Sequence, residues 1–153
     1  MNFLTPFSDA IAAYENPNAV LACSDALRQR GLSISPAQAK ALCETRENAL
    51  RQTARIEFRG GTLEKLINAF SDSDFVRQDN FVELLQELTD LFYASRNEIP
   101  DAVSDDELIA YMKRAFNGAC AGSIELLAGR ELPMLYRRLR AGETFAQSME
   151  KLS

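Results

Sequence analysis

Carboxylates spaced to share one face of a helix are the residues of this chain that could do chemistry. Glu44 and Glu47 lie three residues apart, and Glu87 and Asp90 repeat that spacing later in the chain. Side chains at this spacing lie on the same face of a helix, and Mg²⁺ is bound in proteins through oxygen ligands such as carboxylates. One candidate site is therefore a metal site made of Glu44, Glu47, Glu87 and Asp90.

The absence of histidine excludes several other kinds of site. None of the 153 residues is His, so the chain has no Ser-His-Asp or Cys-His nucleophile pair, no His-ligated zinc or haem, and no imidazole proton switch. The three cysteines, Cys23, Cys43 and Cys120, are far apart and form no Cys-x-x-Cys pair. We expect them to be reduced thiols that pack as small apolar side chains in a cytoplasmic protein.

The carboxylate pairs also resemble a pattern of all-helical nucleotide pyrophosphohydrolases. Those enzymes place Glu-x-x-Glu on one helix and Glu-x-x-Asp on a second, and the segment ELTDLFY (Glu87 to Tyr93) is similar to their second helix. The gap between the two pairs is longer in this chain than in that pattern. The resemblance implies a magnesium-dependent nucleotide hydrolase as the alternative function.

Charge is distributed unevenly along the chain, whose net charge is −5. Residues 62–109 carry three basic and twelve acidic side chains, whereas residues 110–153 carry seven basic and four acidic ones. The basic residues of the last third include Lys113, Arg114, Arg130, Arg137, Arg138 and Arg140, with Tyr136 among them. A basic helix with an aromatic residue can follow a phosphate backbone, so a nucleic-acid-binding helical module is a third hypothesis, which the acidic net charge disfavours.

Helix start and stop signals recur from end to end. Asn16-Pro17 and Ser35-Pro36 place a capping residue before a proline, and Ser104 with Glu107 forms a capping box. Together with the spacing of apolar residues, these signals predict helices over 17–30, 36–55, 62–70, 79–97, 105–117, 123–128 and 132–139.

The segment 79–97 carries the broadest apolar stripe, made of Phe81, Leu84, Leu85, Leu88, Leu91 and Phe92. A stripe this wide predicts a helix on which the others pack. The N-terminus lacks the basic and apolar parts of a secretory signal, and the apolar runs are far shorter than the roughly 18 residues of a membrane span. We therefore expect one all-α domain over residues 1–153, without a membrane segment: a single compact bundle of six to seven helices around a central apolar helix at about 79–97.

Two short segments predict turns. The stretch from Arg55 to Arg59 alternates like a strand before Gly60-Gly61, and five residues fit either a helix end or a short edge strand. We favour the helix end because no partner strand is evident, and we expect positive φ at the glycine pair. The small residues from Gly118 to Gly122 predict a tight corner between helices, where a large side chain would clash.

Several ordered strings carry a wider resemblance. They are ETRENAL (Glu44 to Leu50), RIEFRGGTLEKLI (Arg55 to Ile67), FYASRNE (Phe92 to Glu98), SDDELI (Ser104 to Ile109) and GSIELLAGREL (Gly122 to Leu132). At these spacings the sequence resembles a bacterial family of all-helical proteins that is catalogued as a domain of unknown function. The resemblance implies a small cytoplasmic protein and carries over no functional residue, because that family has no assigned activity.

Taken together, these features favour a non-enzymatic helical interaction or assembly protein that uses no cofactor. Its partner is expected to be another protein or a second copy of the chain, through an exposed groove or the acidic central surface. Apolar residues near the termini are candidates for a partner surface, and docking of terminal helices onto the core is the competing interpretation. These residues are Phe3, Leu4, Phe7, Phe145 and Met149.

Overall fold

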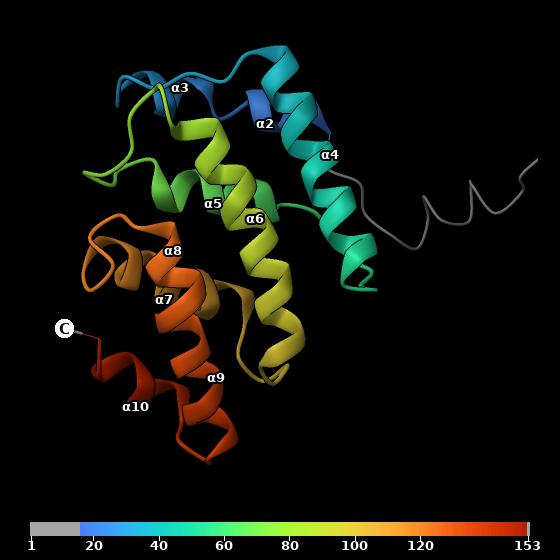
Figure 1. Ribbon diagram of the computed structural model, residues 1–153. Coiled ribbons are helices and arrows are strands. Elements are labelled where there is room, and N and C mark those ends of the chain that lie inside the picture. Colours follow the sequence, from blue (N-terminus) through green and yellow to red (C-terminus); the bar gives the residue numbers. More distant parts are fainter. Residues whose placement is uncertain (1–15, 153) are drawn as a thin grey trace, which may run out of the picture.

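The described part of the chain is built from helices (Figure 1). The computed structural model describes residues 16–152. Its helices are α2 (Pro17–Leu21), α3 (Ser24–Arg28), α4 (Pro36–Gln52), α5 (Thr62–Phe70), α6 (Phe81–Glu98), α7 (Asp105–Asn117), α8 (Ile124–Leu126), the π-helical η1 (Leu127–Glu131), α9 (Leu132–Arg140) and α10 (Phe145–Glu150). Within residues 16–152 no strand is formed, and the predicted all-α class is confirmed.

The predicted helix starts are confirmed by their caps. Ser35 begins α4 and Ser104 begins α7, and each forms a capping box with the residue three positions on. Each box satisfies two backbone N–H groups that a helix start would otherwise leave without a partner. Asn16 caps α2 through its side chain, although the predicted first helix is divided at Ala22 and Cys23 into α2 and α3.

The end of α4 differs from the sequence prediction. The helix stops at Gln52, and residues 55–59 are neither a helix end nor a strand. Ala54 has a φ of 55°, and the Arg55 N–H bonds back to the Leu50 carbonyl. This is a helix C-terminal motif whose left-handed position is usually a glycine. An alanine in that position provides no stop signal, which is why the predicted helix ran on to Arg55.

Two buried clusters hold the helices together. One lies among α2, α3, α4, α5 and the start of α6, and the other lies among the end of α4, α5, the rest of α6, α7, η1 and α9. Cys43 packs in the first cluster and Cys120 in the second, as expected for buried thiols. Burial and, to a smaller extent, the nearby Glu131 carboxylate raise the pKa of the Cys120 thiol, so this thiol is a weak nucleophile.

The longest helix, α6, spans both clusters and lies beside α4 (Figure 1). Phe81 near its start belongs to the first cluster, and Phe92 belongs to the second. Its other face is exposed and carries Glu83, Glu87 and Asp90. A helix with one open face is not surrounded by its neighbours, so the central position that we expected for it is not confirmed.

Residues 124–140 form one continuous helical run. The chain passes from α8 through the π-helical turn η1 directly into α9, whereas the sequence predicts two separate segments at 123–128 and 132–139. Pro133, near the start of α9, has no backbone N–H to donate, and the wider π turn before it changes the hydrogen-bond spacing at this point. The predicted break is therefore a change of helix type.

Among residues 16–152, no helix is both long and apolar enough to cross a membrane. Of the apolar residues near the termini, Phe3, Leu4 and Phe7 lie outside the described residues. Phe145 and Met149 are partly buried against the second cluster. The burial of Phe145 and Met149 therefore supports the interpretation that a terminal helix docks onto the core.

Candidate functional site

A pocket opens between the end of α4, the middle of α6 and the α8–η1 run. Its volume is about 480 Å³, which is within the usual range of ligand sites. The lining comes from Ala49, Gln52 and Thr53 of α4, Glu87, Asp90, Leu91 and Ala94 of α6, and Ile124, Glu125 and Ala128 of the α8–η1 run. Alanines on all three sides keep the space open, and the result is a concave apolar surface with polar groups at its rim.

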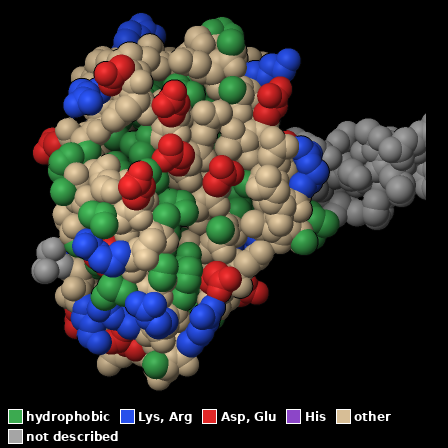
Figure 2. All heavy atoms as spheres, in the orientation of Figure 1, with side chains coloured by type: hydrophobic (Ala, Val, Ile, Leu, Met, Phe, Trp, Pro, Cys, Tyr) green, Lys and Arg blue, Asp and Glu red, His purple; other side chains and the backbone are tan. Residues whose placement is uncertain are grey.

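Three carboxylates at this pocket are left without a basic partner in the described chain. Glu87, Asp90 and Glu125 line the pocket, and their side chains make no ion pair or hydrogen bond within residues 16–152. Some carboxylates elsewhere form ion pairs, for example Glu57 with Arg46, and others, such as Glu150, form none within the described residues. Figure 2 shows acidic side chains gathered over α6 and α8, with Lys and Arg gathered lower on the same face, over α9 and α10. The pocket therefore lies in the acidic half of this face.

Asp90 is a pocket carboxylate with a shifted pKa. Partial burial raises the pKa of Asp90 above the ordinary value of an aspartate, because desolvation disfavours the ionised form. No basic side chain within residues 16–152 offsets this cost. A cationic group brought to the pocket by a ligand would offset it.

We expect Asp90→Asn to stabilise the protein at neutral pH and to leave its stability unchanged in acid. Because folding raises the pKa of this carboxyl, its protonated form stabilises the folded state relative to its ionised form. This stabilisation is complete at pH values below the pKa in the unfolded chain, and it is lost as the pH rises through the higher pKa of the folded protein. Above that window the parent carries a destabilising charge that asparagine lacks. Urea unfolding across acid to neutral pH measures the difference, and a variant less stable than the parent at neutral pH would contradict it.

The structure divides the four predicted metal ligands between two places. Glu87 and Asp90 line the pocket, whereas Glu47 accepts a hydrogen bond of 2.7 Å from Arg46 and Glu44 is exposed. Metal binding requires several oxygens within about 2.0–2.6 Å of one ion. In the part of the chain that the structure describes, no three or more Asp, Glu or Cys residues are grouped to hold a metal. The magnesium site stays a prediction without geometric support.

A buried ionic network joins α4, α5, α6 and the loop after α4. Arg46 is fully buried, and its Nε and Nη2 donate to one oxygen of Glu57 at 3.1 and 2.8 Å. Tyr93 donates to the same oxygen at 2.6 Å, and Thr62 donates to the other at 3.1 Å. Burial and then the Glu57 carboxylate raise the pKa of the Tyr93 phenol, so Tyr93 stays protonated and remains a donor. The network fixes Glu57, a loop residue, to three helices, α4, α5 and α6.

This network holds a loop that exposes two large apolar side chains. Ile56 and Phe58 are 63% and 68% exposed, whereas Glu57 between them is bonded inside the protein. Asn97 of α6 fixes the start of the loop, since its side chain accepts a hydrogen bond of 2.9 Å from Arg55 and donates one of 2.8 Å to the backbone at the end of α4. The strand-like alternation thus describes an anchored loop with one buried and one exposed side.

Sequence reasoning missed Glu125 and the Arg46 network. Glu125 is far from Glu87 in the chain and shares no motif with it, so only the packing of α8 beside α6 brings the two carboxylates to one pocket. The network left no readable signal in the sequence. Arg46 and Glu57 both lie in the strings ETRENAL and RIEFRGGTLEKLI, but nothing in those strings indicates that they pair.

The basic residues of the last third are partly neutralised. Lys113, Arg138 and Arg140 each form an ion pair with a carboxylate. The Tyr136 hydroxyl is hydrogen-bonded to Ser95, and the residue is partly buried against the second cluster. Nucleic-acid affinity comes largely from cations that neutralise phosphates. The nucleic-acid hypothesis therefore gains no support from this arrangement.

A family model matches most of the chain. The model of a family of unknown function, DUF6323, covers residues 19–145. The chain belongs to DUF6323. The DUF6323 match includes the whole pocket lining, the Arg46 network and the loop 55–59. It confirms the resemblance to an all-helical family of unknown function.

Neither a curated protein nor a solved structure matches the chain. The DUF6323 description names no activity, so membership supplies no substrate, cofactor or site residue. The function must therefore be inferred from the chemistry of the pocket and the loop.

Proposed function

We propose that this DUF6323 protein is a non-enzymatic interaction protein whose pocket binds a short segment of a partner protein. The bound segment carries an apolar side chain flanked by Lys or Arg. The observation that supports the proposal is an apolar pocket with three carboxylates that have no basic partner within residues 16–152. The cysteine spacing, which lacks a disulfide pattern, supports a cytoplasmic location.

The two parts of the pocket would contribute differently to binding. Burying one large apolar side chain contributes on the order of 2 kcal/mol. A charge pair at an exposed rim contributes about 1 kcal/mol or less, but it speeds association and rejects acidic segments. Affinity would thus come mainly from the apolar side chain, and selectivity from Glu87, Asp90 and Glu125.

A peptide selection tests this proposal. We expect random peptides displayed on phage and panned on the protein to yield sequences with an apolar residue flanked by Lys or Arg. Synthetic versions of these peptides should bind the parent by fluorescence anisotropy. The double variant Glu87→Lys/Asp90→Lys should weaken binding by at least about tenfold, because two attractive rim charges become repulsive.

A single charge reversal away from the pocket, with half the charge change of the double variant, provides the control. Glu150 on α10 is exposed and makes no ion pair within the described residues, so Glu150→Lys changes the net charge without changing the pocket. It should bind the selected peptides as the parent does, and added salt should weaken both equally. A selection that enriches no common pattern, or peptides that bind Glu87→Lys/Asp90→Lys unchanged, would refute the proposed function.

A further inference from the structure

The loop after α4 carries the apolar and basic side chains that would complement the pocket. Its exposed side chains are Ile56 and Phe58, and arginines stand on either side of them at Arg55 and Arg59. Arg59 makes no ion pair or hydrogen bond within residues 16–152. An apolar tip between two arginines is the counterpart of an apolar pocket bordered by carboxylates.

We propose that the pocket receives this same loop from a second copy of the chain, in a reciprocal dimer in which each copy gives one loop and receives one. Ile56 and Phe58 enter the apolar space. Arg59, with the Arg55 donors that do not bond Asn97, meets Glu87, Asp90 and Glu125. This inference rests on the proposed function, since it names the partner of the same pocket.

The position of the loop fits a two-fold interface. Gln52 and Thr53 line the pocket, and the loop begins immediately after them at the end of α4. Loop and pocket are thus neighbouring patches on one molecule. Two neighbouring patches that complement each other form the self-complementary surface that a two-fold dimer requires, because each patch then meets the other on the partner copy.

The loop is also organised in advance for binding. The Arg46–Glu57 pair and the hydrogen bonds of Asn97 hold the side chains of Glu57 and Arg55 and the backbone just before the loop. Association is costly when a segment must first become ordered, and this loop requires little further ordering. Exposed apolar side chains on a rigid support are typical of interaction sites.

The N-terminal segment of the same chain is a poorer occupant. Residues 1–15 contain apolar side chains but no Lys or Arg, and they carry Asp9 and Glu15. Their charge would be repelled by a rim of carboxylates. Charge therefore favours the loop of a second copy.

Analytical ultracentrifugation of full-length variants over a wide concentration range tests the dimer. The parent should form a dimer that dissociates on dilution. Ile56→Ser/Phe58→Ser removes the exposed apolar side chains and should weaken self-association by at least about thirtyfold. Glu87→Lys/Asp90→Lys, which alters the pocket and keeps the loop, should also be weakened, whereas Glu150→Lys should behave as the parent.

An equimolar mixture of the two weakened variants provides the decisive measurement. The loop variant keeps a normal pocket and the pocket variant keeps a normal loop, so the mixture should regain a heterodimer with one of the two contacts. A parent that stays monomeric, a loop variant that dimerises normally, or a mixture no more associated than its components would overturn the dimer. If the parent is monomeric but still binds the selected peptides, only this inference is refuted. If the parent forms a loop-dependent dimer and the phage selection yields no binding peptides, only the binding of other proteins is refuted.

Discussion

Arg46→Met is expected to lower the free energy of unfolding by about 3–5 kcal/mol, because it leaves a buried carboxylate without its cation. The guanidinium is fully buried, and the Glu57 side chain that it pairs with is only 14% exposed. Tyr93 and Thr62 would still donate to Glu57, but hydrogen bonds to neutral donors do not replace an opposite charge in a desolvated site. Urea unfolding followed by circular dichroism measures the change.

Two further variants separate the buried charge from general damage. Glu47 is the outer partner of Arg46 and its side chain is 30% exposed, so Glu47→Gln should change stability by about 1 kcal/mol or less. Arg46→Met combined with Glu57→Leu should be more stable than Arg46→Met alone, because no buried charge is left without a partner. An Arg46→Met protein with the parent's unfolding midpoint would show that the network contributes nothing to stability.

The same substitution connects the network to the proposed dimer. Where Arg46→Met is still folded, Glu57 loses its strongest tie and the loop 55–59 becomes less ordered. Self-association should then weaken although Ile56 and Phe58 are unchanged, because the loop must be ordered on binding. Stability and association would thus depend on one buried side chain.

Gly122→Ala is expected to destabilise the protein by about 2–4 kcal/mol, combining a left-handed backbone with a clash. Gly122 has a φ of 82°, and an added Cβ would lie 2.5 Å from Cγ of Phe75 and 2.6 Å from its Cβ. These atoms are near the base of the Phe75 side chain, so a rotation of the ring would not relieve the contact. The ring is also held edge-on against Phe116, with 6.2 Å between centroids. Thermal and urea unfolding measure the loss.

Other glycines of the chain separate the two contributions. Gly142 has a φ of 92° and open space around it, so Gly142→Ala should cost only about 1 kcal/mol for the backbone. Gly129 has neither a positive φ nor a close neighbour, and Gly129→Ala should be neutral or slightly stabilising. Phe75→Ala with Gly122→Ala should cost less than the sum of the single changes. A Gly122→Ala protein no less stable than Gly142→Ala would contradict the clash.

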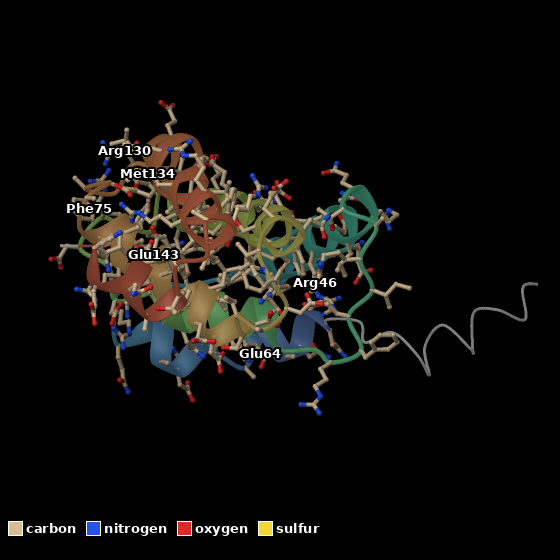
Figure 3. All side chains as sticks on the ribbon, turned by 90° about the horizontal axis from the view of Figure 1, so that it is seen from below. Arg46, Glu64, Phe75, Arg130, Met134 and Glu143 are labelled. Carbon is tan, nitrogen blue, oxygen red and sulfur yellow. The ribbon has the colours of Figure 1, made fainter. Side chains whose placement is uncertain are left out.

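The two sites are expected to behave independently. Figure 3 places Arg46 on the opposite side of the molecule from Phe75, Arg130 and Met134. Substitutions that are far apart and share no contacts usually add in free energy. Arg46→Met and Gly122→Ala together should therefore destabilise by about the sum of their separate effects.

Local signals were enough to place most of the helices. The caps at Ser35 and Ser104 depend on a side chain and the backbone three residues away, so each is contained in a short stretch of sequence. The helix predicted over 62–70 is confirmed as α5, and that over 79–97 is confirmed within two residues as α6. The tight corner predicted between Gly118 and Gly122 is confirmed at Gly122, although only the structure identifies Phe75 as the neighbour.

The sequence predictions failed where a single residue has an unusual backbone conformation or a distant partner. Ala54 adopts the left-handed conformation that glycine normally supplies, so the end of α4 had no marker in the sequence. Residues 55–59 alternate because Glu57 turns inward to Arg46, not because they pair with another strand. A five-residue pattern does not distinguish a strand from a loop anchored by a distant side chain.

By itself, the sequence determined the all-α class, the absence of histidine chemistry, most helix boundaries and the acidic character of residues 62–109, because each depends on composition or on neighbours within a few turns. Only the tertiary structure decided which charges stay without partners. Packing of α8 beside α6 brings Glu125 to the pocket lined by Glu87 and Asp90. Arg46 forms ion pairs with both Glu47 and Glu57. Charge pairing depends on distances of a few ångströms between segments far apart in the chain, and no local pattern of residues contains that information.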